Sequence, residues 1–184
     1  MLTMIVLILA VMIILYVIFT YNKLIRLHNL VKEGWSGIDV QLKQRANLIP
    51  NLVESVKGYM GHESGVLEKI TELRSKCLNT DNIPDRSSNE NMLTGALRQL
   101  FAVTENYPDL KASQNFIELQ KSLESIENQI QLSRRYYNGT VRDYNILIQS
   151  IPSNFIAQNF KFTPADFFEI DDAKEREVPV VKFS

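Results

Sequence analysis

The sequence predicts an all-α protein: an N-terminal transmembrane helix that continues into an antiparallel up-down four-helix bundle, then a short aromatic segment and an extended tail. Three observations support this fold class. The first 22 residues carry no charged side chain, apolar residues recur every three or four positions after them, and no strand-like alternation competes. The expected parts are an anchor over residues 1–21, a helical bundle over 22–162 and an acidic extended tail over 163–184.

The N-terminal segment is apolar enough to cross a membrane. Met1–Tyr21 holds no charge, and about 20 helical residues at ~1.5 Å each span the ~30 Å core of a bilayer. A cleaved signal peptide, the alternative, needs a basic start, a shorter apolar stretch and a small-residue cleavage site, which this segment lacks. Lys23, Arg26 and Lys32 follow closely, so the positive-inside tendency places the C-terminal domain in the cytoplasm.

Four amphipathic helices are expected after residue 21. The first continues the anchor to about Ile49, because its apolar residues form one stripe. Pro50 then gives either a tight turn at 48–50 or a kink, and we expect the turn. The second helix covers about 51–77, the polar run 79–89 is the main loop, and further helices cover about 90–105 and 113–149.

The glycines indicate close helix packing. All seven fall inside predicted helices, where each costs roughly 1 kcal/mol against alanine. Close approach of helix backbones, within the bundle or between subunits, would offset that cost, whereas a loosely formed second helix around Gly58–Gly65 is the alternative. The seven are Gly34, Gly37, Gly58, Gly61, Gly65, Gly95 and Gly139.

Composition and motifs argue against an enzyme. Lys plus Arg (20) nearly balance Asp plus Glu (21), which makes nucleic acid an unsuitable partner. Cys77 is the only cysteine, and with only two histidines a Cys-rich or His-rich metal site is excluded. His62-Glu63 begins like a zinc-protease motif, but Val66 stands where the second histidine is required. We therefore expect no catalytic residue, no cofactor and no metal.

A candidate partner strip lies on the first helix after the anchor. It consists of Trp35, Asp39, Arg45 and Asn47. The alternative for the charged members is a buried contact between Asp39 and Arg45 across helices.

The aromatic segment 151–162 is a second candidate contact surface. It contains Phe155, Phe160 and Phe162 beside Lys161. A fourth helix returns toward the membrane, so we expect these phenylalanines at the membrane surface or against a neighbouring subunit. Burial in the core is the alternative.

The C-terminal tail is acidic. Residues 166–178 hold six acidic and two basic side chains, a net charge of −4, whereas residues 23–78 hold nine basic and six acidic, a net charge of +3. The acidic part is expected to be disordered. Residues 178–183 (VPVVKF) are expected to be extended and able to dock on a partner.

The residues after the anchor resemble the bacterial LemA family. The stretch 35–54 (WSGIDVQLKQRANLIPNLVE) is similar to the family signature, and residues 56–59 with His62-Glu63 continue it. Further similar stretches are 100–103, 107–112, 115–116, 119–120, 136–138, 144–145 and 152–154. The resemblance runs from about Tyr21 to Phe168 and leaves the tail uncovered.

The resemblance implies an N-terminal anchor with an antiparallel helical bundle and no established catalytic activity. It also implies an accessory role at the membrane, beside a membrane zinc protease or a small membrane-associated partner. Some relatives carry a lipoprotein signal in place of the helix, which would put the domain outside the cytoplasm. The main hypothesis is a scaffold in the bacterial plasma membrane that self-assembles. A monomeric adaptor for a membrane enzyme such as a protease is the second, and an enzyme of unrecognised type is the third.

Overall fold

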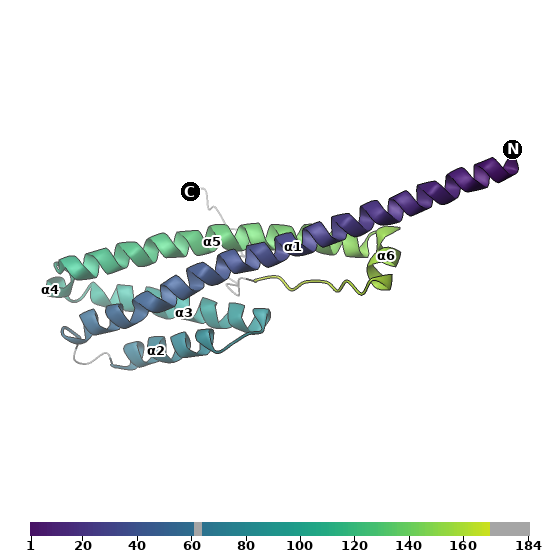
Figure 1. The fold of residues 1–184 in the computed structure, drawn as a ribbon. Helices are drawn as coiled ribbons and strands as arrows, with labels where there is room; N and C mark the ends of the chain where they lie inside the picture. The colour runs from purple at the N-terminus through teal and green to yellow at the C-terminus, as the bar shows by residue number, and fades with distance from the viewer. Residues whose placement is uncertain (61–63, 170–184) are drawn as a thin grey trace, which may run out of the picture. The chain divides into compact units, whose positions relative to one another are not determined.

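The computed structural model describes residues 1–60 and 64–169, which form helices and no strand. The helices are α1 (Leu2–Lys57), α2 (Ser64–Leu78), α3 (Ile83–Thr104), α4 (Pro108–Lys111), α5 (Gln114–Gln149) and α6 (Ser153–Asn159) (Figure 1). The all-α prediction is confirmed. The chain divides into two compact units: the first holds Met1–Val40 and Ile130–Phe167, and the second holds Gln41–Gln129 with residues 168–169.

Helix α1 begins as an apolar, uncovered rod. Its N-terminal part is long and apolar enough to cross a membrane, with a mean hydropathy of 3.2 over 18 residues, none of which is buried. The core helix of a soluble protein would instead be covered by its neighbours. Thr20 is only 4% exposed and Leu24 is fully buried, so packing within the first unit begins in the last turn of the apolar segment. The predicted continuation of this segment into the next helix is confirmed.

The turn expected at 48–50 is wrong, because α1 passes through Pro50 and ends at Lys57. A proline inside a helix has no N–H to donate to the carbonyl four residues earlier. Here that carbonyl belongs to Ala46, and it accepts a hydrogen bond of 2.7 Å from Nε of Arg74 on α2. A charged donor from a neighbouring helix thus replaces the missing bond and allows the helix to continue.

The main loop is also shorter than expected, because α3 begins at Ile83 rather than near residue 90. Asn82 precedes the helix, and its side-chain oxygen accepts from the backbone N–H of Asp85 at 3.2 Å. Pro84 occupies the first turn, where its missing N–H costs nothing, and Asp85 places a negative charge at the positive end of the helix dipole. These local signals start the helix inside a run of polar residues.

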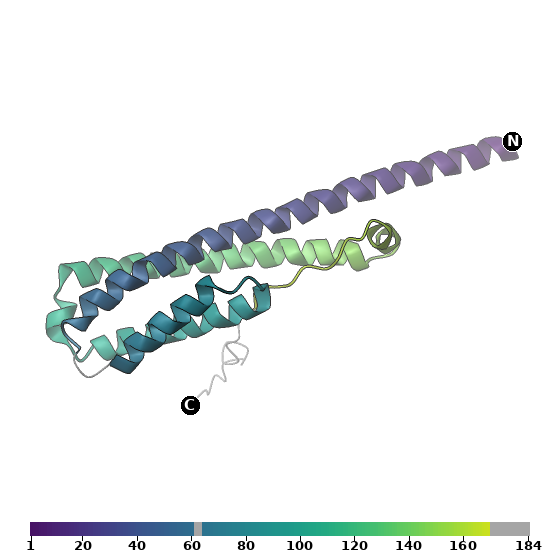
Figure 2. The ribbon, with the colours of Figure 1, turned by 60° about the horizontal axis from the view of Figure 1, so that its bottom comes forward.

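In the second unit, α1, α2, α3 and α5 contribute to one hydrophobic core. α2 and α3 lie side by side in both views (Figures 1 and 2). Tyr59 is 46% exposed and follows the end of α1 at Lys57. The core consists of Ile49, Leu52, Val56, Met60, Leu67, Ile70, Leu73, Cys77, Leu93, Ala96, Leu97, Leu100, Leu110, Phe116 and Leu123.

In the first unit, α1 packs closely on α5 at Gly34. A Cβ added to Gly34 would lie 3.2 Å from the Cα of Tyr137, closer than most Cβ contacts, so a larger residue here would press on the backbone of α5. The prediction of close helix packing is confirmed here. Added Cβ atoms at the other five described glycines would meet nothing within 4 Å, which excludes tight packing there against the part of the chain that the structure describes. Gly61 lies outside that part.

The beginning of the tail is ordered, which corrects the expectation of disorder for residues 166–169. In the first unit, Asn145 makes two hydrogen bonds of 2.9 Å with the backbone of Ala165, and Tyr137 Oη donates to the Asp166 carbonyl at 2.8 Å. In the second unit, Phe168 is fully buried. Backbone hydrogen bonds and one aromatic side chain thus hold residues that composition alone marks as a solvated tail. The segment 178–183 lies outside the described residues.

The C-terminal end of α6 holds a lysine in an unusual backbone conformation. Phe162 N–H donates to the Ala157 carbonyl and Lys161 N–H to the Gln158 carbonyl, the paired bonds that close a helix before a left-handed residue. That residue is Lys161, with φ of 59°. Glycine normally occupies this position, and a residue with a Cβ costs about 1 kcal/mol there.

Candidate functional site

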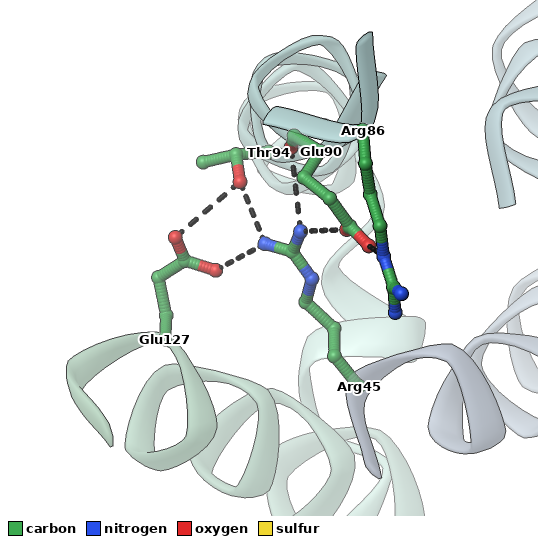
Figure 3. Close-up of polar contacts among 5 residues, drawn as sticks. All are labelled: Arg45, Arg86, Glu90, Thr94 and Glu127. Carbon is green, nitrogen blue, oxygen red and sulfur yellow. Dashed lines mark hydrogen bonds and ion pairs between the residues drawn. The ribbon is translucent and has the colours of Figure 1, made fainter. Parts of the chain in front are cut away.

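A buried cluster of charged side chains lies in the second unit, centred on Arg45 of α1 (Figure 3). Arg45 is 1% exposed. Its Nη1 donates to Oε2 of Glu127 and to Oγ1 of Thr94, both at 2.6 Å, and its Nη2 donates to Oε2 of Glu90 at 2.5 Å. Nη2 also lies 3.3 Å from the backbone carbonyl of Glu90.

Helix geometry explains how these partners meet. Arg86, Glu90 and Thr94 follow one another at intervals of four on α3, so they form a column on one face of that helix. Arg86 Nε lies 3.9 Å from Oε1 of Glu90, which pairs this carboxylate on its second oxygen. Glu127 comes from α5, and its Oε1 accepts from Thr94 at 3.3 Å.

The cluster is electrically balanced, with two arginines against two glutamates. Burial by itself lowers the pKa of Arg45, but the nearby carboxylates of Glu127 and Glu90 outweigh it and raise that pKa above its usual value. The guanidinium is therefore charged at any physiological pH. Its Nη1 and Nη2 groups donate to Glu127, Thr94 and Glu90, whereas its buried Nε has no hydrogen-bond partner among the described residues. The ion pairs on the two Nη groups join α1, α3 and α5 at a fixed register, a role for which buried ion pairs are suited.

A cavity of about 310 Å³ adjoins this cluster in the second unit. Arg45, Thr94 and Glu127 form part of its wall, and Arg98, Phe101 and Glu124 form another part. The volume is at the small end for a ligand pocket. Among residues 1–60 and 64–169, no group of three or more His, Cys, Asp or Glu side chains is arranged to hold a metal ion.

The lone thiol is enclosed by the same unit. Cys77 is 2% exposed on α2, and burial, with the charge of Glu90, raises its pKa to about 12. The side chain therefore behaves as a small apolar core residue. In the folded protein it would resist a thiol reagent on either side of a membrane.

The structure does not assemble the predicted partner strip as one exposed surface. Trp35 is half-buried, with its ring 5.7 Å from that of Tyr137 in the first unit. Asp39 is half-buried, Arg45 is enclosed, and Asn47 is exposed. Arg45 therefore cannot contact a partner. Arg45 is buried, as the alternative interpretation expects, and its carboxylate partners in the second unit are Glu90 and Glu127.

Sequence reasoning missed Glu90, Thr94 and Glu127 as partners of Arg45. A signal was present: Glu90 continues the apolar stripe of α3 toward Leu93 and Leu97, so a carboxylate stands at a position of the buried face. A buried carboxylate requires a cation, and Arg45 occupies an equivalent position in the stripe of α1.

The aromatic segment lies against the end of the apolar span, within the first unit. The Phe160 and Phe162 rings are centred 4.7 Å and 6.0 Å from the Tyr21 ring. Phe155 is 65% exposed and Phe160 48% exposed, whereas Phe162 is half-buried. Burial in the core is thus wrong for Phe155, and the buried residues of α6 are Ser153, Ile156 and Ala157.

Comparison with known proteins identifies the family. The model of the LemA family matches residues 34–183, which extends the similarity through the tail, beyond the expected limit at Phe168. Protein LemA of Metamycoplasma hominis is 29% identical over 161 residues, covering 85% of this chain and 72% of that protein. Magnetosome protein MamQ 2 of Paramagnetospirillum magneticum is 23% identical, covering 81% of this chain and 64% of that protein. MamQ of Magnetospirillum gryphiswaldense is 21% identical, covering 80% and 64% respectively. The chain belongs to the LemA family.

Proposed function

We propose that the chain is a non-catalytic scaffold, anchored in the bacterial plasma membrane by a single span, that self-assembles through its helical domain. The observation that carries this proposal is that α1 is one helix from Leu2 to Lys57. It includes the apolar segment and contributes core residues to both units, so no flexible linker separates anchor from domain. The burial of Thr20 supports retention of the span, because the domain already packs on its last turn.

The proposed domain is an antiparallel up-down four-helix bundle. Within the second unit, α1, α2, α3 and α5 all contribute to the hydrophobic core, which supports a four-helix arrangement. The charge cluster supports a structural role, since Arg45 is already paired with Glu90 and Glu127. A catalytic cation or base would need a free position toward a substrate.

Self-assembly is proposed to use a stripe on α5 in the first unit, here called the α5 stripe. Leu132, Tyr136 and Ile146 are 55%, 49% and 56% exposed, and at 100° per residue they lie within about 80° of one another on the helix. Gly139 lies between them, and a Cβ there would meet nothing within 4 Å. Large apolar residues around a small one allow a second helix to approach closely. The proposed occupant is a second copy of this chain.

Cysteine cross-linking in native membranes tests this use of the α5 stripe. The full chain, with Cys77→Ala, would carry Tyr136→Cys, and a short bifunctional maleimide is expected to join two copies. Ser36→Cys is the matched control, since Ser36 is exposed in the same unit but lies on α1. Cross-linking at Tyr136→Cys that exceeds the control supports the proposal.

Equal cross-linking of both variants, or none, would contradict self-assembly through this stripe. A product that joins Tyr136→Cys to a different protein would favour the second candidate, a monomeric adaptor for a membrane enzyme such as a protease. The exposed α5 stripe is a surface that would suit such a client as well.

We further propose that the domain faces the cytoplasm, because Lys23, Arg26 and Lys32 follow the span. Since Cys77 is buried, the accessible Ser36→Cys variant is the suitable probe. It is expected to resist an impermeant maleimide in intact cells and to react after lysis. Labelling of intact cells at the rate seen after lysis would place the domain outside.

A further inference from the structure

The outer face of α6 and its flanking turns is an exposed apolar surface beside the anchor. Ile151, Phe155 and Phe160 are 80%, 65% and 48% exposed. The opposite side of α6 is buried through Ile156 and Ala157. Apolar side chains therefore lie on both sides of the segment, and Phe155 and Phe160 are turned outward where a soluble domain would expose polar groups.

Ring contacts fix the level of this surface along α1. The rings of Phe160 and Phe162 both pack on the ring of Tyr21. Counting about 20 residues at ~1.5 Å from Leu2, the hydrocarbon core of a bilayer ends near Tyr21. A segment attached to Tyr21 lies at the depth where lipid chains meet their headgroups, which is also where aromatic side chains are favoured.

Charge at this end of the first unit fits an anionic surface. Residues 1–32 and 144–165, all in this unit, carry Lys23, Arg26, Lys32 and Lys161 and no aspartate or glutamate. Lys161 is exposed and keeps a left-handed backbone with φ of 59°, where glycine would be unstrained. The cation thus stands directly after the exposed Phe160, at a position that favours a residue without a side chain.

We propose that residues 151–161 form an interfacial foot that inserts Phe155 and Phe160 among the acyl chains and places Lys161 against anionic lipid headgroups. The inference rests on the proposed membrane anchor but not on self-assembly. The foot fixes the depth of the domain at the bilayer surface. Its occupant is lipid, and contact with a second copy is the competing outcome of the test.

Fluorescence quenching by brominated lipids tests the foot. The full chain with Cys77→Ala and Phe155→Cys, labelled with NBD, would be placed at one copy per nanodisc. Lipids brominated near the headgroup end of their chains are expected to lower its emission by roughly twofold, as for an interfacial segment. A label at Leu132→Cys, on an exposed apolar residue about 25 Å along α5 from Gln149, is the control and is expected to be unaffected.

A label at Leu9→Cys separates failure of the foot from failure of the anchor. Quenching at Leu9→Cys without quenching at Phe155→Cys would overturn the foot and leave the anchor intact. No quenching at either position would overturn both. If the label at Phe155→Cys is shielded only when a disc holds several copies of the chain, the segment contacts a second subunit rather than lipid.

The Lys161→Gly variant tests the role of the cation. It places glycine in the left-handed position, so the thermal midpoint of Trp35 fluorescence is expected to stay the same or rise. Quenching at Phe155→Cys is nevertheless expected to become less dependent on anionic lipid. If quenching at Phe155→Cys differs between anionic and zwitterionic discs by the same amount with and without Lys161→Gly, Lys161 has only a structural role.

Discussion

Replacing Arg45 with alanine is expected to lower the free energy of unfolding of the second unit by about 3–5 kcal/mol, because it leaves a buried carboxylate without its cation. Glu90 is 3% exposed, and Arg45 Nη2 is its nearest charged partner, at 2.5 Å. Glu127 is 27% exposed and can turn toward water more easily. The loss therefore arises mainly at Glu90.

Cys77 reports this change directly, since its thiol is 2% exposed in the same unit and reacts only when the unit opens. At about 1.4 kcal/mol per tenfold, Arg45→Ala is expected to speed its labelling by roughly a hundredfold or more. Gln44→Ala, at the neighbouring exposed position on α1, is the control and should change the rate little. Replacing all four charged members with apolar residues, Arg45→Met, Arg86→Met, Glu90→Leu and Glu127→Leu, should restore slow labelling, because no charge is then left without its partner. If Cys77 is labelled as slowly in Arg45→Ala as in the unmodified protein, the cluster does not hold the helices together.

Replacing Arg74 with methionine is expected to cost about 1–3 kcal/mol, but only while residue 50 is proline. Arg74 satisfies the Ala46 carbonyl that Pro50 leaves without a donor. With Pro50→Ala, the backbone N–H of residue 50 supplies the missing helical bond. The same Arg74→Met change should then cost far less.

Urea denaturation followed by circular dichroism, over the four members of this double-mutant cycle, measures the coupling. Lys76→Met on the same helix is the control, because Lys76 makes only an exposed ion pair with Glu72 and should matter by less than about 1 kcal/mol. Equal losses for Arg74→Met in both backgrounds would mean that the contact with Ala46 does not explain the uninterrupted helix.

Local patterns in the sequence predict most of the helices. Spacings of three and four correctly place Leu24, Ile38, Leu42 and Ile49 on the buried side of α1. The polar run 79–89 was misread because composition outweighed a capping signal present at Asn82, Pro84 and Asp85. That error was avoidable, since caps are read from neighbouring residues.

Other features depend on residues far apart in the chain. A proline in a helix interior usually ends or kinks the helix. At Pro50, α1 continues because Arg74, 24 positions later, donates to the Ala46 carbonyl. The partners of Arg45 are 45 and 82 positions away. Periodicity is compatible with a buried Arg45, the alternative to the partner strip, but it does not indicate which carboxylates lie opposite. The ordered start of the tail likewise depends on Tyr137 and Asn145, which no local pattern connects to residues 165–166.

Self-assembly of the anchored domain is tested by the particle mass of the full chain extracted in mild detergent. A discrete particle of more than one chain is expected, with a shift toward single chains when Leu132 and Tyr136 on the exposed α5 stripe are changed to serine. A particle of one chain at every protein concentration, for the unmodified chain and for the serine variant, would contradict self-assembly and leave the domain as a monomeric adaptor.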